Sequence, residues 1–205
     1  VESSDSIDVS NNGGKTFFVP SISNFSDWGY TSKNVVCFAY SPNGTIFAAQ
    51  MGGVFRSDDF GKSWYLIPNS PNGLFSLAID PTNSDILYGS NYYHLYKSTD
   101  FGKTWKPINN MSFNSLAVDP DNDSIIVGVN YVADYASWVS ISYNGGINFS
   151  RIQGIRSSFI GSVNNGLING LILKSGIPNI SSVDFFGASP QVFFYKTNKG
   201  VALFY

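Results

Sequence analysis

The octapeptide Ser57-Asp-Asp-Phe-Gly-Lys-Ser-Trp64 recurs along the chain and decides its fold. The other copies, which begin at spacings of 47, 41 and 44 residues, are Ser10-Asn-Asn-Gly-Gly-Lys-Thr-Phe17, Ser98-Thr-Asp-Phe-Gly-Lys-Thr-Trp105 and Ser142-Tyr-Asn-Gly-Gly-Ile-Asn-Phe149. A period of about 40 to 50 residues without a helical pattern is typical of propellers with four-stranded blades. The sequence therefore predicts an all-β fold, a β-propeller of four-stranded antiparallel blades.

The residue types of the octapeptide are those of a hairpin tip. Short Ser and Asp or Asn side chains cap backbone N–H groups in a loop, and Gly at the fifth position accepts a positive φ. The aromatic residue at the eighth position is expected to pack under the turn. We interpret the octapeptide as a device of the fold and not as a ligand site.

This pattern resembles the Asp-box, or BNR repeat, which reads Ser-x-Asp-x-Gly-x-Thr-Trp in sialidases, sortilin-type receptors, xyloglucanase-type hydrolases and photosystem assembly factors. The two central copies match at nearly every position, whereas the outer two have Asn12 and Asn144 in place of Asp. The resemblance implies a β-propeller in which the box itself is not the catalytic site.

Segments between the boxes align as strands A to D of successive blades. In one blade these strands are residues 74–80, 85–90, 94–98 and 105–108, separated by turns rich in Pro, Asn and Gly. The same order is found in the blades before and after it. The sequence thus predicts three full blades near residues 33–67, 74–108 and 113–152.

The two ends of the chain fit the pattern less closely. Residues 157–180 are interpreted as a compressed fourth blade, and residues 182–205 as strands A to C of a last blade that residues 6–19 complete. We expect residues 1–205 to form a single domain of five blade units closed by the terminal strands. The alternative is a segment of a larger propeller with six to ten blades. Because the chain opens with Val1 instead of Met, we also expect that a leader or a longer N-terminal part has been removed.

Composition excludes several classes of protein. The chain has 43% hydrophobic residues, which is enough for a core, and its net charge of −2 with 12 Lys and Arg gives no basic stripe for nucleic acid. No apolar run is long enough to span a membrane. The single cysteine, Cys37, lies in an apolar run and is expected to be buried and inert.

Six sequons of the Asn-x-Ser/Thr type indicate a secreted glycoprotein, although about four are expected by chance from this composition. They fall at Asn24, Asn43, Asn110, Asn122, Asn148 and Asn179. From them we expect an extracellular or cell-surface location.

Binding residues are predicted at one end of the blades. The A–B and C–D turns share one end with the boxes, and the B–C and D–A loops share the other. Residues 24–33, 91–94 and 130–138 of this second end were expected to be long, irregular and aromatic loops, which suit recognition of a surface glycan or a protein partner. The predicted ligand-binding residues are Trp28, Tyr30, Tyr92, Tyr93, Tyr131 and Tyr135. The alternative is that these rings fill gaps between blades.

Enzymatic function is not expected, and no catalytic residue is assigned. The resemblance to sialidases implies three arginines and a Tyr–Glu pair, but the chain has only Arg56, Arg151 and Arg156, and its one Glu is Glu2. The alternative is a glycoside hydrolase that uses carboxylates not placed in turns or boxes. These candidates are Asp27, Asp134 and Asp184.

No metal or cofactor is expected either. Residues 119–123 are acidic, but they lack the Gly and the distal Glu of a calcium loop. His94 is the only histidine, so neither a zinc site nor a catalytic triad can be assembled. A remaining alternative is a structural subunit of a surface or viral assembly, in which terminal strands are exchanged between copies to form a homo-oligomer.

Overall fold

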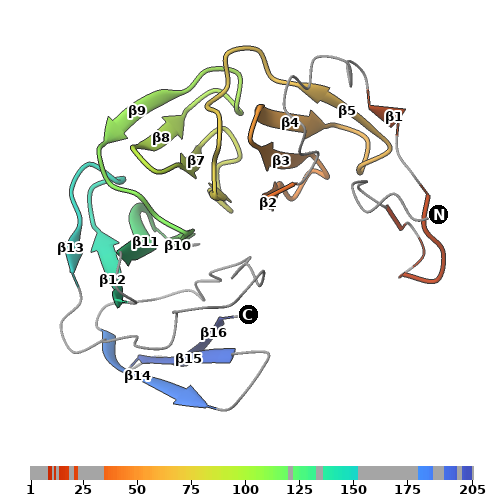
Figure 1. The fold of residues 1–205 in the computed structure, drawn as a ribbon. Coiled ribbons are helices and arrows are strands. Elements are labelled where there is room, and N and C mark those ends of the chain that lie inside the picture. The colour runs from red at the N-terminus through yellow and green to blue at the C-terminus, as the bar shows by residue number, and fades with distance from the viewer. Residues whose placement is uncertain are drawn as a thin grey trace.

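The computed structural model describes residues 9–10, 12, 14–18, 21–22, 35–119, 122–132, 136–151, 180–186, 192–197 and 200–204. Within this part of the chain the regular structure is all β, without a helix, and no helix long and apolar enough to cross a membrane is present. The predicted fold class is confirmed: four-stranded antiparallel sheets follow one another around an arc (Figure 1).

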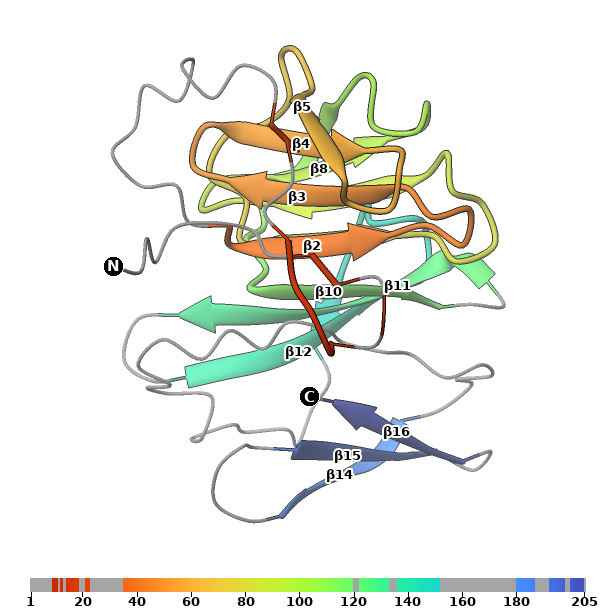
Figure 2. The ribbon, with the colours of Figure 1, turned by 90° about the vertical axis from the view of Figure 1, so that its right-hand side faces the viewer.

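The first complete blade, blade 1, is formed by β2 (Cys37–Tyr40), β3 (Ile46–Gln50), β4 (Gly53–Ser57) and β5 (Ser63–Leu66). Neighbouring strands of this blade are antiparallel, and β2, β3 and β4 lie side by side (Figure 2). A short strand, β1 (Ser21–Ile22), pairs in parallel with β5 at the outer edge.

Blades 2 and 3 repeat this meander. Blade 2 consists of β6 (Ser76–Ile79), β7 (Leu87–Ser90), β8 (Leu95–Ser98) and β9 (Lys106–Asn109), in that order across the sheet. Blade 3 consists of β10 (Ser115–Asp119), β11 (Asn122–Val132), β12 (Ala136–Ser142) and β13 (Ser150–Arg151). The first strands of the three blades, β2, β6 and β10, are neighbours in space.

The described parts of the two ends fit the same plan. β14 (Ile180–Phe186), β15 (Val192–Thr197) and β16 (Gly200–Phe204) form a three-stranded antiparallel sheet over the residues predicted as strands A to C. At the N-terminus, Val9 and Phe18 form an antiparallel bridge around the first box. Closure of the ring stays a prediction, and the compressed blade at 157–180 lies almost entirely outside the described residues.

Apolar side chains hold the blades together face to face. One face of blade 1, with Phe47 and Val54, packs against Leu74, Leu77 and Leu87 of blade 2. The opposite face of blade 2 packs in the same way against blade 3; its core residues with those of blade 3 are Ala78, Tyr88, Leu95, Phe113, Leu116, Val118 and Ile126. Each fully buried Leu or Phe stabilises the fold by about 1.5–3 kcal/mol, so these two layers fix the relative position of the three blades.

Two of the loops expected from the sequence are shorter than predicted. Much of residues 130–138 is not an irregular loop, because β11 and β12 continue as a hairpin through the pairs Asn130–Trp138, Tyr131–Ser137 and Val132–Ala136. Residues 91–94 form a tight turn in which the Asn91 side chain accepts hydrogen bonds from two backbone N–H groups. The prediction underestimated how far a β-branched, alternating sequence extends a hairpin and how well Asn closes a short turn.

Candidate functional site

The blades have two chemically different ends, which we call the box end and the loop end. At the box end, the octapeptide loops contact the A–B turns of their own blades, through Phe101 N–H to the Asp85 carbonyl at 3.0 Å and Gly145 N–H to the Ser124 carbonyl at 2.9 Å. The loop end comprises residues 50–53, 68–75, 91–94 and 110–114, in the B–C and D–A connections. There the Asn91 amide donates to the Asn72 carbonyl at 3.2 Å.

Each box is a closed hydrogen-bonded loop. The Ser57 hydroxyl donates to Asp59 at 2.8 Å and accepts from Gly61 N–H at 2.8 Å. The Asp59 carboxylate accepts from the backbone and the hydroxyl of Ser63, at 2.8 and 2.6 Å, and these bonds lower the pKa of Asp59 to about 2. The Trp64 indole donates to the Gly61 carbonyl at 3.0 Å under the turn. This arrangement leaves the carboxylate occupied within its own loop.

The outer boxes keep this geometry with Asn in place of Asp. The Asn12 carbonyl oxygen accepts from Thr16 N–H at 3.0 Å, and its amide donates to the Thr16 hydroxyl at 2.7 Å. In the fourth box, Asn144 accepts from Ser142 at 3.0 Å and from Asn148 N–H at 2.9 Å. An amide oxygen therefore replaces the carboxylate oxygen that caps the loop backbone.

The structure shows a second positive φ in the box that the sequence did not reveal. Gly61 and Gly102 have φ of 84° and 79°, as predicted for the fifth position, but Phe60 and Phe101 at the fourth position also have φ of 59°. Gly145 occupies this fourth position in the last box, with φ of 66°. The available signal of an unusual backbone conformation was the occurrence of Gly at this position in the other two copies, as Gly13 and Gly145.

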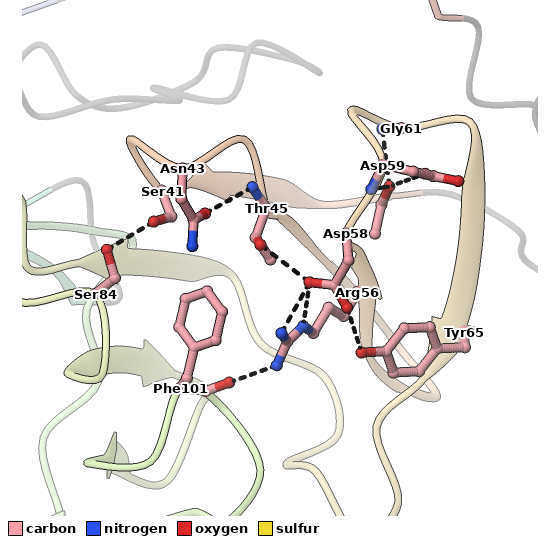
Figure 3. A network of polar contacts seen from close by, with 11 residues as sticks. Ser41, Asn43, Thr45, Arg56, Asp58, Asp59, Gly61, Tyr65, Ser84 and Phe101 are labelled. Carbon is pink, nitrogen blue, oxygen red and sulfur yellow. Dashed lines mark hydrogen bonds and ion pairs between the residues drawn. The ribbon is translucent and has the colours of Figure 1, made fainter.

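A polar network at the box end accounts for Arg56 (Figure 3). Its guanidinium forms an ion pair with Asp58 at 2.8 Å and donates to the Phe101 carbonyl at 3.1 Å. Asp58 also accepts from the Tyr65 and Thr45 hydroxyls, at 2.8 and 3.0 Å. Burial acts to raise the pKa of Asp58, but the hydrogen bonds from Arg56, Tyr65 and Thr45 outweigh it and lower that pKa. The network joins blades 1 and 2.

At the loop end, Tyr92 and Tyr93 are strongly exposed, with 73% and 72% of their surface accessible. The edge of one ring in the Tyr92–Phe75 pair meets the face of the other at a centroid distance of 4.1 Å. Trp28, Tyr30 and Tyr135 lie outside the described residues. Tyr131 lies on β11, and its side chain is not among those described.

Two further loop-end residues were not predicted as a site. His94 Nδ1 and Asn110 Oδ1 are 3.0 Å apart, and the His94 ring lies between the rings of Tyr93 and Tyr96. The signal in the sequence was the recurrence of polar amides, Asn72, Asn91 and Asn110, in the loops of neighbouring blades.

Charge is segregated between the two ends in residues 35–119, 122–132 and 136–151. The loop-end segments in these ranges contain no Asp, Glu, Lys or Arg. All the charged residues lie in or beside the A–B turns and boxes: Arg56, Asp58, Asp59, Lys62, Asp80, Asp85, Lys97, Asp100, Lys103, Lys106, Asp119, Asp123 and Arg151. The sequence alone does not show this segregation, because the loop-end segments 24–33 and 130–138 contain Asp27, Lys33 and Asp134, which lie outside the described residues.

The candidates for the enzymatic alternative are not brought together in the described structure. Asp27 and Asp134 lie outside the described residues, and Asp184 lies within β14. No three His, Cys, Asp or Glu side chains gather as a metal site in the part that is described. Cys37 is buried, and burial raises its pKa to about 12, as suits an inert thiol.

Four of the six predicted glycosylation sites have exposed side chains: Asn43, Asn110, Asn122 and Asn148. The other two, Asn24 and Asn179, lie outside the described residues.

Comparison with known families identifies the repeat. The BNR-Asp box repeat family matches residues 54–67 and 95–108, which contain the two central boxes. The chain therefore contains BNR-Asp box repeats at two sites. No curated protein sequence is significantly similar to the Asp-box chain.

Solved structures share its fold. An ancestral GH74 enzyme is similar with a TM-score of 0.53 and 23% identity over 83% of this chain and 22% of that chain. GH74 from Niastella koreensis gives a TM-score of 0.51 and 21% identity, over 83% of this chain and 28% of that one. A chain of the nidogen/laminin complex gives 0.52 and 12% identity, over 80% and 72%. The Asp-box protein thus has the fold of β-propellers and spans about a quarter of the GH74 chains.

Proposed function

We propose that the Asp-box protein is a non-enzymatic recognition module, located outside the cell or at its surface, that binds an uncharged glycan or an uncharged protein surface at its loop end. The observation that carries this proposal is the exposure of Tyr92 and Tyr93 among the described loop-end segments, residues 50–53, 68–75, 91–94 and 110–114, which contain no charged side chain. Exposed paired tyrosines offer large apolar faces with polar tips, which suit both kinds of ligand.

The tyrosines are presented by a rigid turn. The side-chain Oδ1 of Asn91 accepts hydrogen bonds from Tyr93 N–H and His94 N–H, both at 3.0 Å, which closes the turn. Contact with Phe75 supports the ring of Tyr92 from the neighbouring loop. Because the backbone of the turn is held by these bonds and the ring of Tyr92 rests on Phe75, less freedom is lost when a ligand binds, which reduces the entropic cost of recognition.

The absence of charge at the described loop end favours an uncharged ligand. A phosphate, a sialic acid or an acidic peptide would need Lys or Arg partners, which in the described ranges lie at the box end. The loop end instead offers the exposed amide of Asn110 and the imidazole of His94. Such groups pair with hydroxyls and backbone amides at modest desolvation cost.

Binding is tested with immobilised panels of neutral glycans, acidic glycans and proteins. Tyr92→Ala with Tyr93→Ala is expected to weaken binding at least about tenfold, which corresponds to about 1.4 kcal/mol. Tyr143→Ala, which removes an exposed ring at the box end, is the matched control and should bind as the wild type does. Equal losses in both variants, or binding restricted to acidic ligands, would contradict the proposal.

Hydrolysis is the second candidate, because the fold is shared with GH74 enzymes. Incubation with neutral β-glucan oligosaccharides should give no products. If the wild type hydrolyses these oligosaccharides and Asp134→Asn or Asp27→Asn does not, the protein is a hydrolase and the recognition proposal is wrong.

A further inference from the structure

Asn110 is a sequon residue at the loop end. It follows β9 directly, is exposed, and begins the triplet Asn110-Met111-Ser112. Its Oδ1 lies 3.0 Å from His94 Nδ1. With Oδ1 held by the imidazole, the carboxamide is fixed and its Nδ2, the atom that carries an N-linked glycan, is directed away from His94.

Aromatic rings lie beside this amide. The ring centroids of His94 and Tyr93 are 6.5 Å apart, and those of His94 and Tyr96 are 5.7 Å apart. Tyr93 is largely exposed. A sugar on Asn110 therefore starts next to the His94 ring, with the exposed Tyr93 ring beyond it, and the faces of such rings can cover the C–H groups of a pyranose.

The other three described sequons lie at the box end. Asn43 and Asn122 use their Oδ1 to accept the backbone N–H of the third residue of their own sequon, at 3.0 Å in both cases. Asn148 lies within the fourth box, where its backbone N–H donates to Asn144. These three lie on turns among charged side chains. Asn110 differs from these three in that its amide is held by the side chain of an aromatic residue, His94, at the loop end.

We propose that Asn110 carries an N-linked glycan and that the first sugars of this glycan pack against Tyr93 and His94. The donor is a polyprenyl-phosphate-linked oligosaccharide acted on by a glycosyltransferase of the secretory route. A bond forms between Asn110 Nδ2 and the anomeric carbon, and the bond from that carbon to the phosphate oxygen breaks. The lipid phosphate leaves with the electron pair, Nδ2 gives up one proton, and no redox change occurs.

The attached glycan would occupy the loop end of its own chain. Glycosylated and bare protein are then expected to differ in their access to an external ligand at Tyr92 and Tyr93. The proposal itself does not depend on such a ligand, because occupancy of Asn110 and packing of its sugars are measured on the protein alone.

The test uses the full chain secreted from a glycosylating host and the same chain made in bacteria. Glycopeptide mass spectrometry is expected to find Asn110 occupied. Asn110→Gln should lower the Tm of the secreted protein by about 2–4 °C more than it lowers the Tm of the bacterial protein. Because both variants lose the contact with His94, this extra loss measures the contribution of the glycan. Asn148→Gln is the matched control and should show no such difference. Tyr93→Ala should abolish the stabilisation by the glycan.

Two results would overturn the proposal. One is an empty Asn110 in secreted protein whose other sequons are filled. The other is an occupied Asn110 whose stabilising effect persists in Tyr93→Ala. Cross-relaxation in nuclear magnetic resonance between sugar protons and the Tyr93 ring provides a direct readout, and its absence in a glycosylated sample would equally count against the packing.

Discussion

The guanidinium of Arg56 in blade 1 lies 4.3 Å from the ring centroid of Phe101 in blade 2 and donates a hydrogen bond to the Phe101 carbonyl. The next boundary has a related arrangement. Lys97, the equivalent of Arg56, has its ammonium 5.1 Å from the ring centroid of Tyr88, and a Cβ on Gly145 would lie 3.5 Å from that ammonium. A cation before the box serine thus lies near an aromatic ring in both cases, which is Phe101 of the following blade for Arg56 and Tyr88 of the same blade for Lys97.

Arg56→Met is expected to destabilise the protein by about 2–3 kcal/mol. The variant loses the hydrogen bond to the Phe101 carbonyl and the cation–π contact, and it leaves Asp58 without its counter-ion. Urea unfolding measures the change. Arg56→Lys keeps the charge and should lose less, whereas Lys106→Met on an exposed strand edge serves as the control. A loss below about 0.5 kcal/mol in Arg56→Met would mean that the network does not hold the blades together.

The stability of the fold is expected to depend on pH through the Asp59 carboxylate of the second box. Hydrogen bonds from Ser63 lower the pKa of Asp59 to about 2, below the value of about 3.9 in an unfolded chain. A carboxylate with a lowered pKa stabilises the fold above the unfolded value and loses this contribution as the pH falls. Thermal unfolding of the wild type should therefore show Tm falling between about pH 4 and pH 2.

Asp59→Asn isolates this effect. Asn occupies the same position in the outer boxes and caps the loop there, so the variant is expected to fold. Its Tm should fall less steeply between about pH 4 and pH 2 than that of the wild type. Identical slopes in the two proteins would assign the acid sensitivity to other carboxylates.

The sequence predicted the fold because the repeat is local and its chemistry is explicit. Blades 1 to 3 were predicted from the repeat period, the turn residues and the alignment of strands. The box geometry around Ser57 and Asp59 follows from side chains that lie within eight residues of one another. The positive φ of Phe60 and Phe101 was not predicted, because residues other than Gly rarely adopt this conformation and Phe gives no sign of it. The conformation belongs to the box itself, since Phe60 adopts it with a largely exposed ring.

The candidate site was predicted only in part. Tyr92 and Tyr93 were expected to be exposed, and they are. The hydrogen bond of His94 with Asn110 joins a B–C turn to a D–A loop, so only the folded register reveals it. The absence of charge from residues 50–53, 68–75, 91–94 and 110–114 is seen only when the structure places these segments at one end.

Phe60 and Phe101 share a strained backbone position but differ in what their rings contact. Phe101 packs on Phe47 at a centroid distance of 5.4 Å, whereas the Phe60 ring is 67% exposed. Substitution by Gly relieves the backbone strain of the positive φ at both sites. It also increases the conformational entropy of the unfolded chain, which costs about 0.4–1 kcal/mol of stability. Phe60→Gly should stay within about 1 kcal/mol of the wild type in urea unfolding, and Phe101→Gly should lose about 2 kcal/mol with its ring contacts. Equal effects would show that backbone strain alone governs this position.

The last prediction concerns the flank of blade 1 that faces away from blade 2. Phe38 on β2 is 48% exposed, while Leu116, at the equivalent position of β10, is 4% exposed because blade 2 covers it. Leu116→Ala is expected to destabilise the protein by about 2–4 kcal/mol. Phe38→Ala should lose less than about 1 kcal/mol, because truncating a half-exposed side chain removes little buried surface. Urea unfolding of both variants compares the two flanks directly.

If Phe38→Ala lowers the free energy of unfolding as much as Leu116→Ala does, the side of blade 1 that faces away from blade 2 is not exposed to solvent. That result would mean that a further sheet covers β2, as the predicted closure of the ring by the terminal segments requires. Light scattering distinguishes the source of that sheet, because closure within one chain leaves a monomer, whereas exchange of terminal strands between copies gives oligomers that Phe38→Ala should dissociate.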